Sequence, residues 1–127
     1  MTRSHSYSTP TQRQLRVAEE IRHILAQIFA RADYFDEVIQ KAHITVTEVR
    51  ISPDLKSAKV YVMPMGGAHQ ETVIEALNKA APFYRSELGR QLAIRFTPSL
   101  RFYIDETFDE ASKITALLQS NRVKQDL

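Results

Sequence analysis

Residues 44–64 read ITVTEVRISPDLKSAKVYVMP, and this stretch decides the fold. Residues 44–51 are rich in β-branched side chains, which favours a strand, and apolar and polar side chains alternate over 58–63, which predicts a second strand. Between them, the Ser-Pro-Asp-Leu sequence at 52–55 places proline in the favoured second position of a turn. Two strands joined by a short turn predict an antiparallel hairpin.

The alternation of the first strand changes phase halfway along. Ile44 and Val46 have one parity, whereas Val49 and Ile51 have the other. Successive side chains of a strand point to opposite faces, so one extra residue is needed to bring all four to the same face. We therefore expect a β-bulge near Thr47 and Glu48.

Upstream of the hairpin, apolar residues recur at the three- and four-residue spacing of an amphipathic helix of about five to six turns. Thr11 is the expected N-cap region, because Pro10 lies directly before it. Residues 33–42 show no clear period and are expected to form a connector. The predicted apolar stripe consists of Leu15, Ala18, Ile21, Leu25, Ile28 and Ala32.

Downstream of the hairpin, residues 70–80 have helical spacing until Pro82 interrupts the pattern. Proline lacks an N–H and disfavours helical dihedral angles at Ala81, yet the helical period resumes at once with Tyr84 and Leu88. This pattern predicts two helices joined by a kink. After Thr97-Pro98, alternation over 100–104 predicts a third strand, and a final helix is expected from about Phe108.

The predicted order is helix, strand, strand, helix–kink–helix, strand, helix. It indicates an α+β fold, with a three-stranded sheet packed on helices. A chain of 127 residues is long enough for one domain. We expect this domain to span residues 11–119, between flexible tails at 1–10 and 120–127.

The composition excludes several kinds of chemistry. The chain has no cysteine, so disulfides, thiolate metal sites and cysteine nucleophiles are excluded. None of the four histidines lies at metal-ligand spacing from another, and no phosphate-binding loop or nucleophile elbow is present. We therefore expect no catalytic residues, metal or cofactor. With no apolar run near the ~20 residues that span a membrane, and a polar N-terminus, the expected location is the cytoplasm.

The net charge of +2 conceals two basic segments. Residues 1–31 carry a net charge of +3, and residues 79–101 carry five basic residues against Glu87 alone. Basic surfaces commonly bind polyanions, although ordinary solvated arginines are the alternative. The kink would also create a helix N-terminus, whose N–H groups suit phosphate. The candidate RNA-binding residues are Arg13, Arg16, Lys59, Lys79, Arg85, Arg90 and Arg95.

Four stretches, spread over residues of about 11 to 118, together resemble the ribosome-binding factor A family. The first is Arg16-Val17-Ala18-Glu19 with Ile21, and the second is the hairpin over 49–62. The third is the kinked element over 76–89, and the fourth runs over 95–102 with Asp105 and Ile114 beyond it. Each stretch alone is a weak signal, but the ordered set is specific.

The resemblance implies a type II KH-like fold. Ordinary KH modules clamp nucleic acid with a GxxG loop between two helices, and this sequence has no GxxG. The family's Ala-x-Gly kink corresponds here to Ala80, Ala81 and Pro82, with proline in the third position. Proline still breaks a helix, but its ring and its missing N–H disfavour close approach of RNA to the backbone.

The resemblance also implies a function. It predicts a monomeric, non-enzymatic factor that binds the free 30S ribosomal subunit and assists late maturation and 5′-end processing of 16S rRNA, including in the cold. Ribosomal proteins and assembly GTPases are further possible partners. A KH-like protein acting on another RNA and a protein-interaction module are the alternatives. Salt dependence would separate these classes, because phosphate contacts weaken steeply with salt.

Overall fold

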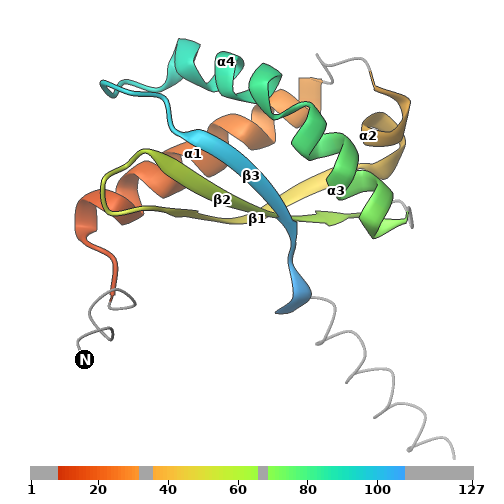
Figure 1. Cartoon of the computed structure of the whole chain (residues 1–127), viewed down its shortest axis with the longest axis horizontal. Helices are drawn as coiled ribbons and strands as arrows, with labels where there is room; N and C mark the ends of the chain where they lie inside the picture. The colour runs from red at the N-terminus through yellow and green to blue at the C-terminus, as the bar shows by residue number, and fades with distance from the viewer. Residues whose placement is uncertain (1–8, 32–35, 66–68, 108–127) are drawn as a thin grey trace, which may run out of the picture.

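The computed structural model describes residues 9–31, 36–65 and 69–107. The described elements follow one another in the predicted order, which confirms the α+β fold from the first helix to the third strand (Figure 1). The predicted final helix and most of both predicted tails lie outside the described residues. The elements are α1 (Gln12–Arg31), α2 (Glu37–Ala42), β1 (Ile44–Ile51), β2 (Ser57–Pro64), α3 (Gln70–Lys79), α4 (Ala81–Gln91) and β3 (Ser99–Ile104).

The three strands form one sheet in the order β1-β2-β3. β1 and β2 pair antiparallel, which confirms the hairpin, and β3 runs parallel to β2. The pairing of β1 shifts between Val46 and Glu48, which confirms the bulge and leaves Thr47 as the extra residue. Because of this extra residue, Val46 and Val49 are both buried on the same face of the sheet.

The turn between β1 and β2 is closed as predicted by a hydrogen bond from the Leu55 N–H to the Ser52 carbonyl, at 2.9 Å. The Asp54 carboxylate accepts hydrogen bonds from the Ser52 hydroxyl at 2.6 Å and from the Lys56 N–H at 3.0 Å. These bonds, the one from Ser52 first, lower the pKa of Asp54. The turn therefore carries its own polar network.

The predicted N-cap at Thr11 is confirmed by a reciprocal pair of hydrogen bonds. The Gln14 N–H donates to Thr11 Oγ1 at 3.1 Å, and the Thr11 N–H donates to Gln14 Oε1 at 2.9 Å. Leu15 was expected in the apolar stripe, but it is 54% exposed. The reason is that Gln14 faces the sheet and donates to the Ile51 carbonyl, so that Leu15, about 100° further around the helix, points to solvent.

The prediction of a connector over 33–42 is wrong for its second half, which forms α2. The Asp36 side chain caps this helix by accepting a hydrogen bond from the Ile39 N–H at 3.2 Å. Ile39 and Ala42 are buried, and His43 ends the helix in a left-handed conformation. Six residues are too few for a helical period to show in the sequence.

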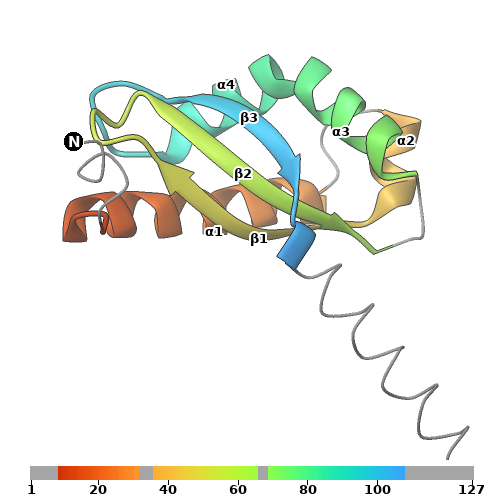
Figure 2. The ribbon, with the colours of Figure 1, turned by 60° about the horizontal axis from the view of Figure 1, so that its bottom comes forward.

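The helices α1, α3 and α4 pack against one face of the sheet, so that the core lies between the sheet and these helices. The view in Figure 2 has the sheet in front of α1 and α4. Three aromatic rings join the two layers at the centre: Tyr84 of α4 lies 4.8 Å from Phe29 of α1 and 5.8 Å from Phe102 of β3, measured between centroids. The other face of the sheet is not part of this core.

The kink between α3 and α4 is present as predicted, but its position differs by one residue. The non-helical residue is Ala80, with φ −88° and ψ 0°, whereas Ala81 is already the first residue of α4. Pro82 is the second residue of α4, where a helix has no intrahelical partner for an N–H. Proline therefore starts the second helix instead of distorting the residue before it.

The side-chain amide of Asn78, near the end of α3, makes the two hydrogen bonds to the backbone of β3 that a neighbouring strand would make. Its Oδ1 accepts from the Phe102 N–H at 2.8 Å, and its Nδ2 donates to the Phe102 carbonyl at 3.2 Å. The Ser99 N–H donates to the carbonyl of Lys56, just before β2, and the Asp105 N–H donates to that of Val62 in β2, so the backbone of Phe102 faces the opposite side of β3. Asn78 thus ties the helical layer to the sheet.

Candidate nucleic-acid interface

All seven predicted RNA-binding residues are exposed, but they do not form a single patch. Six belong to the helices or to the segment after α4, whereas Lys59 lies on the face of the sheet that points away from the helices. On the helical side, Arg13 and Arg16 lie near the start of α1, Lys79 ends α3, Arg85 and Arg90 lie on α4, and Arg95 follows α4.

The basic residues around the kink differ in what they already bind. Arg85 donates from Nε and Nη2 to the Thr97 carbonyl, at 3.1 and 2.9 Å, and Arg90 Nε lies 3.7 Å from Glu87 Oε2. Lys79 and Arg95 have no ion pair within the described part of the chain. These two are the cations that remain available to a phosphate without giving up a partner.

The expected phosphate site at the N-terminus of α4 is not formed. The N–H groups of Phe83 and Tyr84 both point to the Ala80 carbonyl, at 2.9 and 3.3 Å, and Pro82 has no N–H. The backbone therefore presents no array of N–H groups at the kink. Tyr84 is 1% exposed and belongs to the core, as its helical position predicts.

The segment after α4 is held against that helix by two features. One is the pair of hydrogen bonds from Arg85 to Thr97. The other is Gly89, where a Cβ would lie 2.7 Å from Thr97 Oγ1, so a side chain at this position would collide with the segment. Arg95 lies in this segment, and its placement therefore depends on Arg85.

Sequence reasoning identified Lys59 but missed its neighbours. The strand register places Arg50 of β1 and Arg101 of β3 directly opposite Lys59, and it places Tyr61 opposite Tyr103. The signal was available, since Lys59-Val60-Tyr61 and Arg101-Phe102-Tyr103 share one pattern of basic, apolar and tyrosine residues. Only the parallel pairing of β2 and β3 shows that the two copies lie in register.

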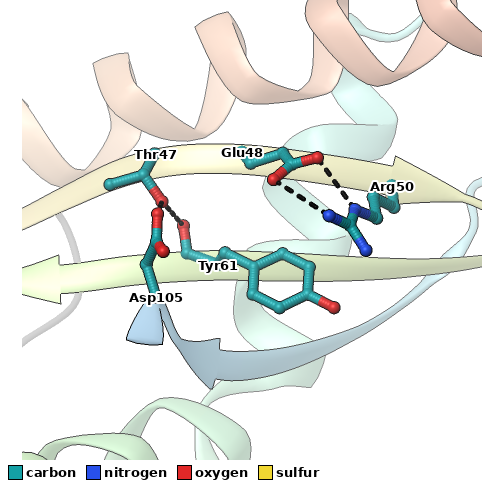
Figure 3. A network of polar contacts seen from close by, with 5 residues as sticks. All are labelled: Thr47, Glu48, Arg50, Tyr61 and Asp105. Carbon is teal, nitrogen blue, oxygen red and sulfur yellow. Dashed lines mark hydrogen bonds and ion pairs between the residues drawn. The ribbon is translucent and has the colours of Figure 1, made fainter. Parts of the chain in front are cut away.

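A polar network adjoins this row at the bulge (Figure 3). Thr47 Oγ1 lies 2.5 Å from Asp105 Oδ2 and 3.2 Å from the Tyr61 carbonyl oxygen, so it connects β1 to the end of β3 across β2. Arg50 Nε donates to Glu48 Oε2 at 2.8 Å, and this bond raises the pKa of Arg50. Arg50 is therefore charged and partly neutralised by Glu48.

Within residues 9–31, 36–65 and 69–107, no group of three or more histidine or acidic side chains could hold a metal ion. None of the helices in these ranges is both long enough and apolar enough to cross a membrane.

The chain is similar to known proteins over nearly its whole length. The family model described as "Ribosome-binding factor A" matches residues 13–118. A protein of that name from Methylobacterium nodulans is 52% identical over 118 residues, which cover 93% of this chain and 87% of the relative.

Solved structures share the fold. The solution structure of a Thermotoga maritima protein, described as a putative ribosome binding factor A, has a TM-score of 0.61 and 26% identity, covering 75% of this chain and 89% of that one. A homology model of the Thermus thermophilus factor, fitted into a cryo-EM map of a 30S complex, has a TM-score of 0.58 and 24% identity. It covers 71% of this chain and 92% of that one.

Proposed function

Because the chain belongs to the ribosome-binding factor A family, we propose that it binds the free 30S ribosomal subunit and assists late maturation and 5′-end processing of 16S rRNA, including at low temperature. In this proposal it is a cytoplasmic monomer that has no catalytic activity of its own. The observation that carries the proposal is the match to the family over residues 13–118, at about half identity to the M. nodulans relative.

The arrangement of the helical side supports a chaperone-like mechanism. Lys79 and Arg95 are exposed cations without ion pairs in the described residues, and neutralising phosphates with such cations releases counterions and drives binding. Since the N–H groups of Phe83 and Tyr84 are occupied and Pro82 has none, we assign the phosphate contacts here to side chains. In KH modules a loop between two helices clamps the nucleic-acid strand, and in this proposal the kink between α3 and α4 takes the place of that loop.

The rigidity of this side suits the task of holding rRNA in one conformation. Asn78 fixes α3 to β3, and Arg85 fixes the segment that carries Arg95. The cations therefore project from a framework that is set before binding, which lowers the entropy cost of forming the complex. The T. thermophilus relative was fitted into a map of a 30S complex, and this supports the choice of partner.

Sedimentation with separated ribosomal particles tests the proposal. We expect the tagged protein to sediment with 30S subunits and not with 50S subunits or 70S ribosomes. Cells without the protein should accumulate 16S rRNA with an unprocessed 5′ end, most strongly in the cold, when mapped by primer extension. Equal sedimentation with all three particles, or none with 30S subunits, would contradict the proposal.

A pair of double variants tests which face contacts the subunit. Lys79→Ala with Arg95→Ala should weaken 30S binding, because both cations are available to phosphate. Arg22→Ala with Lys41→Ala is the matched control, since it removes the same charge from residues that are paired with Glu19 and Glu37. Arg85 is left unchanged because its loss would also free the segment at Thr97. If both pairs bind alike, the helical side is not the rRNA face.

Salt dependence separates the alternatives. An rRNA contact made by cations loses affinity steeply as salt rises, whereas an apolar contact with a ribosomal protein or an assembly GTPase does not. Competition with an unrelated structured RNA then distinguishes the 30S subunit from a general RNA target. We expect a steep salt dependence and poor competition.

A further inference from the structure

We propose that the open face of the sheet, opposite the helices, binds a short single-stranded RNA segment, with two bases stacked on Tyr61 and Tyr103 and the phosphates along Arg50, Lys59 and Arg101. This surface is separate from the kinked helices. The inference goes beyond 30S binding, because it assigns an RNA-binding surface and the kind of RNA that fits it.

The cations form a row across all three strands. Lys59 is paired with Arg50 on one side and with Arg101 on the other, and neighbouring strands lie about 4.8 Å apart. All three side chains are exposed. Lys59 and Arg101 have no ion pair within the described residues, whereas Arg50 is held by Glu48. The row thus offers two uncompensated positive charges to a phosphate backbone.

The tyrosines form the next row along the same face. The rings of Tyr61 and Tyr103 stack with centroids 5.6 Å apart and an interplanar angle of 28°, and both are partly exposed. The Arg50 guanidinium lies 5.2 Å from the centroid of the Tyr61 ring. Adjacent rings next to cations are the combination by which proteins bind single strands, since every base has a face that can stack.

The charge on this face changes sign along the strands, which orients the RNA. Glu48 lies opposite Tyr61 in the tyrosine row itself, where it pairs with Arg50, and Asp105, held by Thr47, lies beyond that row (Figure 3). These carboxylates repel phosphate, so the backbone follows the cation row and the bases extend over the rings toward the acidic end. Hydrogen-bond donors on the base edges then face carboxylate acceptors.

The face is poorly suited to a protein partner. The large hydrophobic side chains that are exposed in the described residues are Leu15, Val38, Met65 and Phe96, and none of them belongs to a strand of the sheet. A protein interface needs an apolar, well-packed centre, which this face does not provide. Charge and rings together favour single-stranded nucleic acid over a second copy of the chain.

Binding of a fluorescein-labelled ten-nucleotide oligouridine tests this surface by anisotropy, with a twelve-base-pair RNA duplex as comparison. We expect the single strand to bind more tightly than the duplex. Replacing Tyr61 and Tyr103 with Leu should weaken binding of the single strand by about 5- to 150-fold for each ring. Replacing both with Phe keeps the rings and should leave the affinity within about threefold. Because the chain has five tyrosines and no tryptophan, quenching of tyrosine fluorescence reports the stacking directly.

The salt dependence provides a second test that does not rely on the tyrosines. Lys59→Ala and Arg101→Ala should each reduce the slope of log K against log salt by about 0.7. Arg22→Ala with Lys41→Ala should leave the slope unchanged. These charge variants keep the proposal testable if the leucine variant fails to fold in a melting experiment.

Three results would overturn the proposal. One is oligouridine affinity that is unchanged in a folded leucine variant and in the charge variants. Another is loss of binding only on replacing Lys79 and Arg95, and the third is a wild-type protein that prefers the duplex. If the protein binds oligouridine through this face but does not sediment with 30S subunits, the function proposed above is wrong and this inference stands.

Discussion

Arg85 illustrates what the structure adds to the sequence at the level of a single residue. Five basic residues and one acidic residue in 79–101 predicted a basic surface, and all of the candidates are exposed. Their interactions within the protein differ, however. Arg85 donates hydrogen bonds to the Thr97 carbonyl, whereas Lys79 has no ion pair in the described residues. Composition shows how much charge a segment carries, whereas only the folded structure shows which charged side chains already have a partner within the protein.

Gly89 offers a test at this scale. In an exposed helix, Gly→Ala usually adds up to ~1 kcal/mol of stability, because glycine is the more flexible residue in the unfolded chain. Here the new Cβ would lie 2.7 Å from Thr97 Oγ1, so we expect Gly89→Ala to lower the free energy of unfolding by about 1 kcal/mol.

Thr97→Ala removes the colliding oxygen and provides the control. In a double-mutant cycle followed by urea denaturation, the Gly89→Ala change should become neutral or stabilising once Thr97 is alanine, with a coupling of about 1–2 kcal/mol. Additive effects of the two changes would show that the segment after α4 moves aside without cost.

At the scale of elements, the sequence predicted the helices and strands whose buried residues recur at a regular spacing. The helices α1, α3 and α4, the hairpin and even the bulge followed from the spacing of apolar residues. The helix α2 was missed because it has only six residues, and its one local signal was Asp36 as a capping residue. Leu15 was misplaced because the helical period does not show that its neighbour Gln14 takes the position facing the sheet, where it bonds to the Ile51 carbonyl.

The bulge predicts an asymmetry between two single-residue deletions. Deleting Thr47 leaves Val46 and Val49 two positions apart, so both still point into the core of a regular ladder. The expected cost is about 1–2 kcal/mol, from the lost hydrogen bonds of the Thr47 hydroxyl. Thermal melting should show a folded protein.

Deleting Arg50 is the matched control, because it lies in the same strand but breaks the alternation. Val49 and Ile51 would become neighbours, and one of them would leave the core at a cost of about 1.5–3 kcal/mol. We expect this variant to be much less stable than the Thr47 deletion. Equal stabilities would mean that the bulge does not set the register of β1.

Pro82 permits a test of what maintains the kink. The break lies at Ala80, which is buried, and Tyr84 and Leu88 anchor α4 in the core. We therefore expect Pro82→Ala to keep the kink and 30S binding and to lose about 0.4–1 kcal/mol of stability, since proline restricts the unfolded chain. Pro82→Gly should lose more, because glycine is the poorer helix former. A rise in helical circular dichroism with weaker 30S binding would show instead that proline enforces the bend.

At the scale of the whole molecule, pairing between distant segments determines which residues share a surface. Residues 57 and 99 are partners in the parallel pair β2–β3, although α3 and α4 separate them in the chain. Apolar spacing indicates that 99–104 is a strand but not which strand it joins or in which register. This is why Lys59 was predicted to bind RNA whereas Arg50 and Arg101 beside it were missed.

The bond between Asn78 and Phe102 bears on self-association. β3 is an edge strand, and unpaired backbone groups on such a strand are a template on which another molecule can add its own strand. The Asn78 amide occupies the N–H and the carbonyl of Phe102, so an incoming strand finds its central hydrogen-bonding position already taken. We expect Asn78→Ala to remain folded but to aggregate faster in light scattering on gentle heating, with Gln70→Ala, an exposed change on α3, as the control. The side-chain amide of Asn78 thus blocks the addition of a strand from another molecule to the edge of the sheet at β3.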